Sequence, residues 1–455
     1  MTNKVSNPLN GFNWQPQPLA AALVSESVQN ISAASSEIAL LAQRMRDETG
    51  TRLIDWLETI AIEESPAMLE KISAAGFVKG EGNFWRNPRG LFPKLLLHSE
   101  GAAVEIKVDS VEDFSKAWRR HFKILIHGDP AGGQFRAGTL VPENSEYGYP
   151  SFAVIQRHGS PSEPSDGNTN RDITAVPKHR AAFAKRQRST EAAAQGFGLA
   201  QSLFKAAAAD LDPLWASSLF FAAERDYWMS RNHAARVQYE RQQKLGLGWG
   251  NHDHHTYRSS RECFHLLVGV LEQMGFECRE RFYAGREAGW GAQVLEHSAC
   301  GIIVFADVDL SPEEITDDFA HQPLAPSKEL GTVGLWCALH GESFLEAGMH
   351  HLECQFDFDA ARVQLAAAGV ETMAPFTDFS HLKQAFTQGK TWPVATNRIN
   401  ELLAKGHIDV AQAEQFRGSG ALGSHLEILE RNDGYKGFNQ TGISDIIART
   451  DPRKW

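Results

Sequence analysis

The alternation of polar and apolar positions is clearest in the second half of the chain, at a histidine-rich stretch. Residues 250–258 read Gly-Asn-His-Asp-His-His-Thr-Tyr-Arg, just after a helical pattern that stops at Gly246. Successive side chains of an extended strand point to opposite faces. One face is therefore predicted to carry His252, His254, Thr256 and Arg258. Two or more imidazoles beside a guanidinium make a poor hydrophobic core and favour a ligand site.

This histidine strand opens a unit that the chain repeats. In the first copy, a helical pattern at 262–274 leads through Gly-Phe-Glu into several strand-like runs. In the second copy, a strand at 349–356 again begins with adjacent histidines, and a helix is expected at 359–368 before Gly-Val-Glu. A mostly helical insertion at about 379–417 then interrupts the second copy. The two copies predict paired βαβββ modules.

The second histidine strand has the sharper division of faces. Its apolar face is expected to pack on the helix and holds Leu352, Cys354 and Phe356. Its polar face holds His351, Glu353 and Gln355, so His351 is the better candidate ligand and His350 is expected to be packed or hydrogen-bonded. Each copy also carries a late carboxylate, Glu296 in the first and Glu427 or Glu430 in the second.

The first half of the chain has a less regular pattern. The predicted organisation is a loosely ordered tail at 1–35, an α+β domain of unknown role at 36–158, a linker at 159–177, a helical connector at 178–246 and the paired-module domain at 247–455. The last connector helix is expected to start at Pro213, capped by Asp212, and to end at Gly246. The overall class is α+β. The N-terminal half could be a lid, a dimerisation surface or a degenerate module.

Composition restricts the class of protein further. Hydrophobic residues make up 42% and charged residues 22% of the 455 positions, which is ordinary for a globular protein. No apolar run approaches the roughly 18 residues of a membrane span, and the N-terminus lacks a signal-peptide core, so a cytoplasmic protein is expected. A net charge of −11 disfavours nucleic-acid binding. The five cysteines form no CxxC pair, so any metal would be held by histidine and carboxylate.

Two histidines and one carboxylate on a divalent metal form a facial triad, which leaves coordination positions open for substrate and O₂. The same ligand types also suit zinc or manganese. Arg258 follows His254 by four residues on the same predicted face, and it could bind a substrate carboxylate with both arms of its guanidinium. A salt bridge to a nearby acid is the alternative role for Arg258.

The repeated modules resemble those of the vicinal oxygen chelate superfamily. Within it, the run Asp253–Arg258, the strand His350–Glu353 and the pair Glu430-Arg431 are similar to motifs of the 2-oxoadipate dioxygenase/decarboxylase (hydroxyglutarate synthase) family. The resemblance covers about the last 200 residues. It implies a non-haem Fe(II) dioxygenase that converts a 2-oxo acid and O₂ into a hydroxy acid. The implied metal ligands are His254, His351 and Glu430, and the implied anchor for the substrate carboxylate is Arg258.

Three alternatives stay open at this point. Glu427 competes with Glu430, because strand alternation places the two on opposite faces. Glu296 could be a fourth ligand, which would indicate a glyoxalase-like lyase or isomerase using zinc, manganese or nickel. The chain could also be a metal-free binding protein that retains the fold. The expected partners are a small carboxylate substrate and O₂, with no nucleic acid and no membrane; a homodimer is left open.

Overall fold

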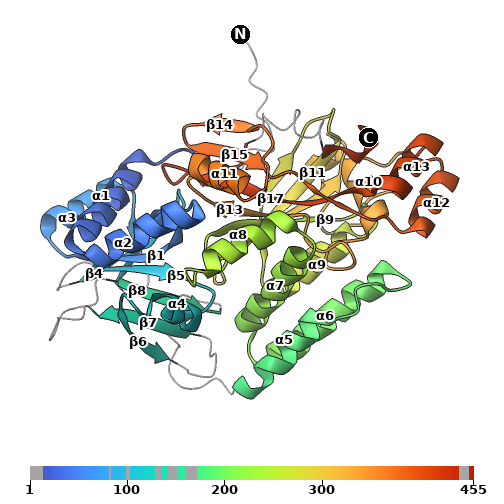
Figure 1. The fold of residues 1–455 in the computed structure, drawn as a ribbon. Coiled ribbons are helices and arrows are strands. Elements are labelled where there is room, and N and C mark those ends of the chain that lie inside the picture. The colour runs from blue at the N-terminus through green and yellow to red at the C-terminus, as the bar shows by residue number, and fades with distance from the viewer. Residues whose placement is uncertain are drawn as a thin grey trace, which may run out of the picture.

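The computed structural model describes residues 14–80, 83–98, 103–128, 135–141, 152–158, 172–439 and 450–454. Each half of the chain forms one sheet, and helices run along and between the two sheets (Figure 1). No helix within the described ranges is long and apolar enough to cross a membrane.

The C-terminal sheet confirms the predicted pair of βαβββ modules. Its strands follow the order β10-β11-β12-β9-β13-β17-β15-β14, and β9 pairs antiparallel with β13 where the two copies meet. The first copy contains β9 (His252–Arg258), α9 (Phe264–Gln273), β10 (Glu277–Tyr283), β11 (Trp290–His297) and β12 (Ile302–Asp309). The second contains β13 (His351–Gln355), α11 (Phe358–Ala367), β14 (Thr377–Phe379), β15 (Leu382–Phe386) and β17 (Ala421–Arg431).

Two further segments interrupt this sheet. The helix α10 (Thr332–His340) lies in the connection between the copies. The insertion of the second copy lies between β15 and β17 and contains β16 (Lys390–Trp392), α12 (Thr396–Ala404) and α13 (Val410–Ser419). The predicted insertion began at about 379, which is too early, because β15 still pairs with β17 and completes the module.

The N-terminal half contains a second pair of the same modules. Its strand order β2-β3-β4-β1-β5-β8-β7-β6 repeats that of the C-terminal sheet, with β1 antiparallel to β5, β1 parallel to β4 and β5 parallel to β8. The elements are β1 (Leu57–Glu63), α3 (Pro66–Ala74), β2 (Val78–Lys79), β3 (Phe84–Arg86), β4 (Lys94–His98), β5 (Ala103–Lys107), α4 (Val111–Trp118), β6 (Lys123–Gly128), β7 (Phe135–Val141) and β8 (Phe152–Arg157). Of the three alternatives for the N-terminal half, the degenerate module is therefore the one that matches its strand order.

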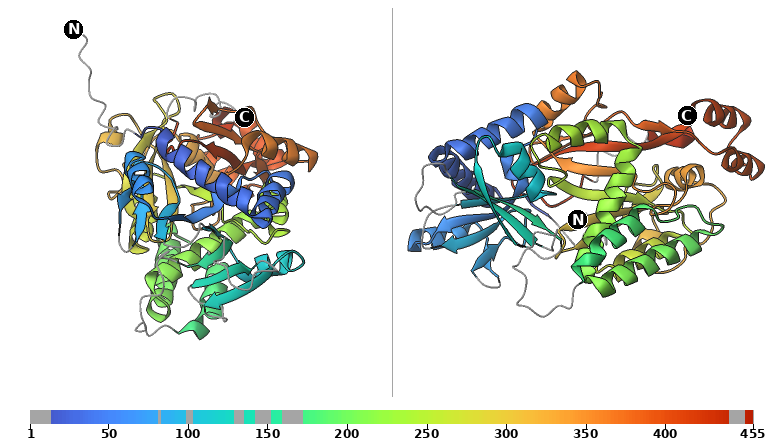
Figure 2. Two further views of the ribbon diagram at one scale, coloured as in Figure 1. Left: turned by 90° about the vertical axis from the view of Figure 1, so that its left-hand side faces the viewer. Right: turned by 60° about the horizontal axis from the view of Figure 1, so that its bottom comes forward.

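The prediction of a loosely ordered tail at 1–35 is wrong for most of residues 14–35, the part that the structure describes. Residues Pro18–Ala34 form α1, and Ser36–Arg44 form α2, both drawn in blue in Figure 2. One side of α1 is buried against the N-terminal core through Ala20, Leu23, Val24 and Ile31. The polar residues between these positions obscure an apolar stripe with helical spacing.

The connector forms four helices: α5 (Val176–Ala184), α6 (Ala193–Asp210), α7 (Pro213–Ser230) and α8 (His233–Gln243). Asp212 caps α7 through the backbone N–H of Trp215, as predicted. The single helix expected from Pro213 to Gly246 is instead two helices. The break between them lies at Asn232. The Asn232 side chain accepts a hydrogen bond from the N–H of Ala235 and so caps the start of α8.

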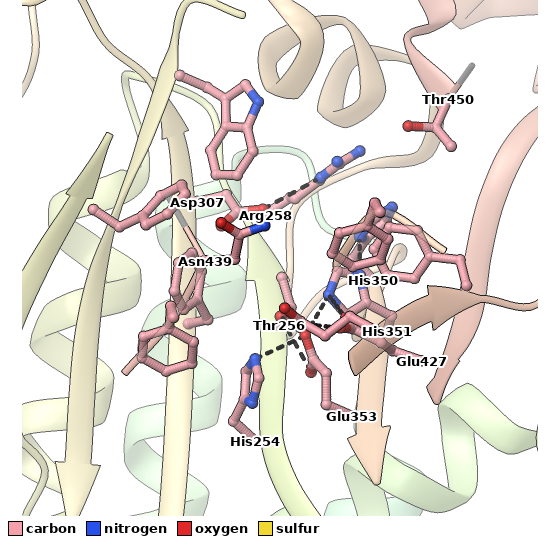
Figure 3. A pocket seen from close by; sticks show the side chains of 17 residues that line it. His254, Thr256, Arg258, Asp307, His350, His351, Glu353, Glu427, Asn439 and Thr450 are labelled. Carbon is pink, nitrogen blue, oxygen red and sulfur yellow. Dashed lines mark hydrogen bonds and ion pairs between the residues drawn. The ribbon is translucent and has the colours of Figure 1, made fainter. Parts of the chain in front are cut away.

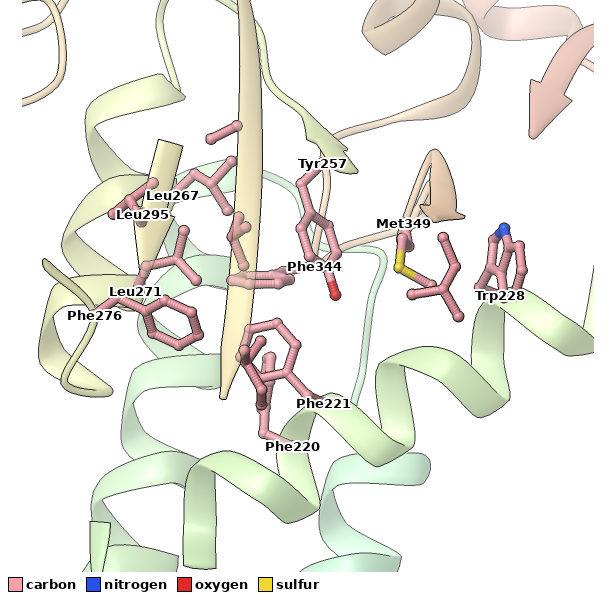
Figure 4. Packing of buried hydrophobic residues seen from close by; sticks show 14 of the residues in the cluster. Phe220, Phe221, Trp228, Tyr257, Leu267, Leu271, Phe276, Leu295, Phe344 and Met349 are labelled. Atoms are coloured by element: carbon pink, nitrogen blue, oxygen red, sulfur yellow. The ribbon is translucent and has the colours of Figure 1, made fainter. Parts of the chain in front are cut away.

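The helix α7 fixes the orientation of the histidine strand. Phe221 on α7 lies 5.4 Å from the His255 ring and 6.2 Å from the Tyr257 ring, and Tyr257 in turn packs on Phe344 (Figure 4). Both β9 side chains are fully buried. Because one face of β9 is held in this core, the alternate face with His254 and Arg258 is turned to the other side of the sheet.

Candidate metal centre

The face of the C-terminal sheet opposite α7 holds a cavity of about 100 Å³ (Figure 3). Polar side chains line it from β9, β12, β13 and β17. They include His254, Thr256, Arg258, Asp307, His351, Glu353 and Glu427. The cavity therefore lies where the two modules meet, and both histidine strands contribute to it.

His254 is held with its Nε2 directed at the carboxylate cluster. Its Nδ1 lies 2.8 Å from Asp253 Oδ1, and its Nε2 lies 2.8 Å from Glu353 Oε1. Asp253 is fixed in turn by a two-pronged ion pair with Arg431, at 2.9 and 3.1 Å. Burial opposes protonation of His254, but Glu353 and Asp253 together raise its pKa to about 9. A carboxylate behind a histidine is the usual arrangement that orients a metal-binding imidazole.

His351 meets the same carboxylate from the second module. Its Nε2 lies 2.7 Å from Glu353 Oε1 and 3.7 Å from Glu427 Oε2. Its Nδ1 lies 2.6 Å from His350 Nδ1. His350 is buried and packs edge-on against Trp336, in agreement with the packed role expected for it. Both predicted histidine ligands therefore converge on one carboxylate oxygen.

Glu427, not Glu430, joins this cluster. Ligand atoms of His351, Glu353 and Glu427 all lie within 4.8 Å of one another. Gln384 donates to Glu427 Oε1 over 2.7 Å and holds the carboxylate in place. Burial and the neighbouring Glu353 raise the pKa of Glu427 well above its ordinary value. Two buried carboxylates this close favour a shared proton or a cation between them.

The predicted ligand Glu430 points away from the cavity. Its carboxylate accepts the backbone N–H of Phe358 at the start of α11, over 2.8 Å, and faces Arg52 and Lys383 at 3.7 and 3.5 Å. Strand alternation, which separates Glu427 from Glu430, thus overrides the family motif at this position. The structure therefore places Glu427, and not the predicted Glu430, beside His351 and Glu353.

Two other candidate residues lie outside the cluster. Glu296 pairs with Arg279 and Lys436, at 3.1 and 3.3 Å, so it does not supply the fourth ligand considered above. His252 does not share a face with His254. A register shift between β13 and β9 opposite His252 breaks the alternation, and the His252 ring packs against His255 on the other side of the strand.

Arg258 lies on the cavity wall, as expected from its spacing to His254. Its Nε is 3.6 Å from Asp307 Oδ2, and its guanidinium lies over the Trp336 ring. Burial raises the pKa of Asp307 to about 8, against the opposing effect of Arg258. The raised pKa of Asp307 weakens its ion pair with Arg258 near neutral pH, and this leaves the guanidinium more available to an incoming carboxylate.

The rest of the cavity is lined by aromatic rings. They are Phe282, Trp290, Phe305, Phe376, Phe386 and Phe438. Arg258 is the single arginine or lysine among the described lining residues. The cavity thus offers one cationic contact and a large apolar wall.

Sequence reasoning missed three contributors to this site: Glu353, Asp253 and Asp307. The signal for Glu353 was present, because the alternation of the second histidine strand placed it on the same polar face as His351. Asp253 and Asp307 carried no such signal, since their partners Arg431 and Arg258 lie on other strands.

The fit of this donor set to a metal is good. His351, Glu353 and Glu427 offer ligand atoms within 4.8 Å of one another in a buried space, and His254, which Asp253 orients, contacts Glu353 from the other module. Paired βαβββ modules joined through their first strands, with these groups inside, define a vicinal oxygen chelate fold.

Comparisons with known proteins find solved structures of low similarity. A mutant of 4-hydroxymandelate synthase from Streptomyces coelicolor matches 88% of this chain and 99% of its own, with 12% identity and a TM-score of 0.30. Methylmalonyl-CoA epimerase from Mycobacterium tuberculosis matches 40% and 88%, with 11% identity and a TM-score of 0.23. The uncharacterized protein YdcJ from Shigella flexneri, which includes domain DUF1338, matches 56% and 73%, with 12% identity and a TM-score of 0.25. No family model and no curated protein matches the chain. The assignment of the fold therefore rests on strand order and pairing.

Proposed function

We propose that this protein is a metal-dependent dioxygenase that decarboxylates a 2-oxo acid. The observation that carries the proposal is the convergence of His254 and His351 on Glu353, with Glu427 beside His351, in a cavity whose wall presents Arg258. Fe(II) held by His254, His351 and Glu427 would supply chelation of the substrate and activation of O₂. In the overall reaction, a 2-oxo acid and O₂ give CO₂ and a hydroxy acid one carbon shorter.

The protein groups have separate tasks in this proposal. Arg258 binds the substrate carboxylate with two parallel N–H donors, which fixes the orientation of the 2-oxo group relative to the metal ligands. Asp253 holds the His254 ring, and Gln384 holds Glu427. The aromatic wall excludes water from the reacting atoms.

The lining also bears on the substrate. A second carboxylate, as in 2-oxoadipate, would need its own cation, and the described lining residues offer none besides Arg258. Six aromatic side chains instead suit an apolar substituent. The proposed substrate is therefore a 2-oxo acid with a hydrophobic side chain, in place of the 2-oxoadipate-like acid expected from the sequence.

Glu353 favours a second candidate function. If both Glu353 and Glu427 bind the metal together with the two histidines, four protein ligands occupy it, as expected for a glyoxalase-like lyase or isomerase using zinc, nickel or manganese. Such an enzyme would not consume O₂.

One experiment separates these candidates. Protein loaded with Fe(II) is mixed with phenylpyruvate or with 2-oxoadipate, and O₂ uptake and CO₂ release are measured together. Equal uptake and release with phenylpyruvate, lost in Arg258→Met and retained in the exposed control Arg286→Met, supports the dioxygenase. An absence of O₂ uptake with every 2-oxo acid supports the second candidate. Failure of both histidine variants His254→Ala and His351→Ala to change the metal content would instead favour a metal-free binding protein.

A further inference from the structure

A second, larger cavity of about 590 Å³ lies between the two halves of the chain. The N-terminal modules contribute the ends of β5 and β8 and the start of α4, the connector contributes α5, α7 and α8, and the C-terminal modules contribute β9 and β12. His252, which the register shift turns away from the metal centre, is part of its lining. Its volume is within the range of small-molecule sites, and no part of the proposed reaction uses it.

Two cationic side chains in the lining of this cavity, Lys107 and Arg225, have imidazole neighbours. Lys107 Nζ lies 3.3 Å from His252 Nε2, and Arg225 Nη1 lies 3.3 Å from His255 Nε2. Within the described ranges, no carboxylate forms an ion pair with either Lys107 or Arg225. Arg157 beside them is already paired with Glu58, at 2.6 Å. Lys107 and Arg225 thus both line the cavity, each with an imidazole nitrogen 3.3 Å away.

The titration of neighbouring groups reports the same positive field. Burial and the surrounding arginines lower the pKa of Lys107 to about 8. Burial, together with Arg180, Lys107 and Arg225, lowers the pKa of His158 to about 4. Both groups belong to the lining, and each loses its proton more readily, first because it is buried and second because cations lie nearby.

Three aspartates also line the cavity: Asp109, Asp113 and Asp226, of which Asp109 and Asp226 are exposed. Burial and these three aspartates raise the pKa of Tyr239 to about 12. Asp109 is held in place by the backbone N–H of Trp249, over 2.8 Å. The lining therefore presents charges of both signs to one cavity.

We propose that this cavity between the two halves binds a free amino acid, with its carboxylate on Lys107 and Arg225 and its ammonium on Asp109 and Asp226. A zwitterion of this kind matches lining charges of both signs at once, whereas a simple anion or amine would match only one sign. The volume leaves room for the side chain of the amino acid. This site is independent of the proposed dioxygenase reaction, because it uses none of the residues of the metal centre.

The test measures binding to the full-length protein. The standard amino acids are added one at a time in a thermal-shift assay. Acetate and inorganic phosphate serve as purely anionic probes and ethylamine as a purely cationic probe, all at equal ionic strength. Any amino acid that raises the Tm is then titrated by calorimetry. We expect one site, and a Kd that is at least about tenfold weaker in Lys107→Met and Asp226→Asn, because each removes one charged contact.

Three sets of controls make the outcome decisive. The exposed charges Lys205 and Asp378 provide matched variants, Lys205→Met and Asp378→Asn, which should bind as the wild type does. Arg258→Met should also bind normally, and loss of binding in this variant would place the amino acid in the substrate cavity and overturn the proposal. If Lys107→Met does not fold by circular dichroism, Lys107→Gln replaces it. Stabilisation by phosphate alone, or by no amino acid, would equally overturn the proposal.

Discussion

Glu353 on β13 and Glu427 on β17 are direct neighbours in the register of two parallel strands, and both carboxylates enter the same buried space. Neighbouring positions on parallel strands point to the same side of a sheet. The pairing of the first and last strands of the second module therefore creates a site with two acids, which His254 and His351 approach from β9 and β13.

The identity of the carboxylate ligand gives the first prediction. Glu427→Gln should lose stoichiometric metal, because an amide is a much weaker ligand than a carboxylate. Glu430→Gln should keep its metal but lower the free energy of unfolding by about 1–3 kcal/mol, because the buried N–H of Phe358 loses a charged acceptor. Elemental analysis and urea unfolding measure the two effects. If Glu430→Gln lost its metal and Glu427→Gln kept it, Glu430 would be the ligand, as the family motif implies.

The second prediction concerns Asp253, which orients His254. Asp253→Asn removes the charge that holds both the His254 ring and Arg431. Loss of such an orienting group typically weakens metal binding by about 10- to 100-fold. Competition with a chelator of known affinity measures this change, and Asp378→Asn on the exposed β14 serves as the control. Unchanged metal affinity would remove the orienting role.

The third prediction concerns pH. Asp307 has a pKa raised to about 8 by burial, so it becomes ionised as the pH rises through that value. The ionised carboxylate then competes with the substrate carboxylate for Arg258. The KM for a 2-oxo acid should therefore rise several-fold between about pH 7 and about pH 9. In Asp307→Asn the same rise should be absent, and its persistence in this variant would assign it to another group.

The fourth prediction tests the buried ion cluster that joins the connector to the C-terminal modules. Glu224 on α7 is fully buried and forms ion pairs with Arg186 and Arg188, and Arg186 also donates to the carbonyl of Phe344. Glu224→Gln leaves two cations without a counter-charge and should cost about 3–5 kcal/mol of the free energy of unfolding. Glu401→Gln, in an exposed pair with Lys405, should cost less than about 0.5 kcal/mol. Equal losses in chemical denaturation would contradict this account.

Local patterns predicted the C-terminal fold well, and the reasons are physical. The alternation of β13 is strict because Leu352, Cys354 and Phe356 all enter one core, so the positions of His351 and Glu353 followed from it. On β9 the alternation held for His254 and Arg258 but failed at His252. A register shift depends on the pairing of two distant strands, and such a shift leaves no mark in a single sequence.

The N-terminal half could not be predicted in the same way. Its first two outer strands, β2 and β3, have only two and three residues, too few to show a period. The interfaces that identify it as a module pair are long-range contacts, for example β1 with β5 and β5 with β8. Glu430 shows a different limit of sequence-based prediction. A motif match favoured Glu430 as a ligand, and it was excluded only because its side chain lies on the face of β17 that points away from the cavity.

The two sheets share one strand order, but within the described ranges the cluster of histidines and glutamates lies on the C-terminal sheet. In the row where the C-terminal sheet aligns His254, Glu353 and Glu427, the N-terminal sheet aligns Thr59, Glu105 and Ala153. Neither β1, β5 nor β8 contains a histidine. The same strand order therefore accommodates a row with a single carboxylate and no histidine. That row, with Glu105 already in position, offers protein engineers a place to build a new centre on this scaffold.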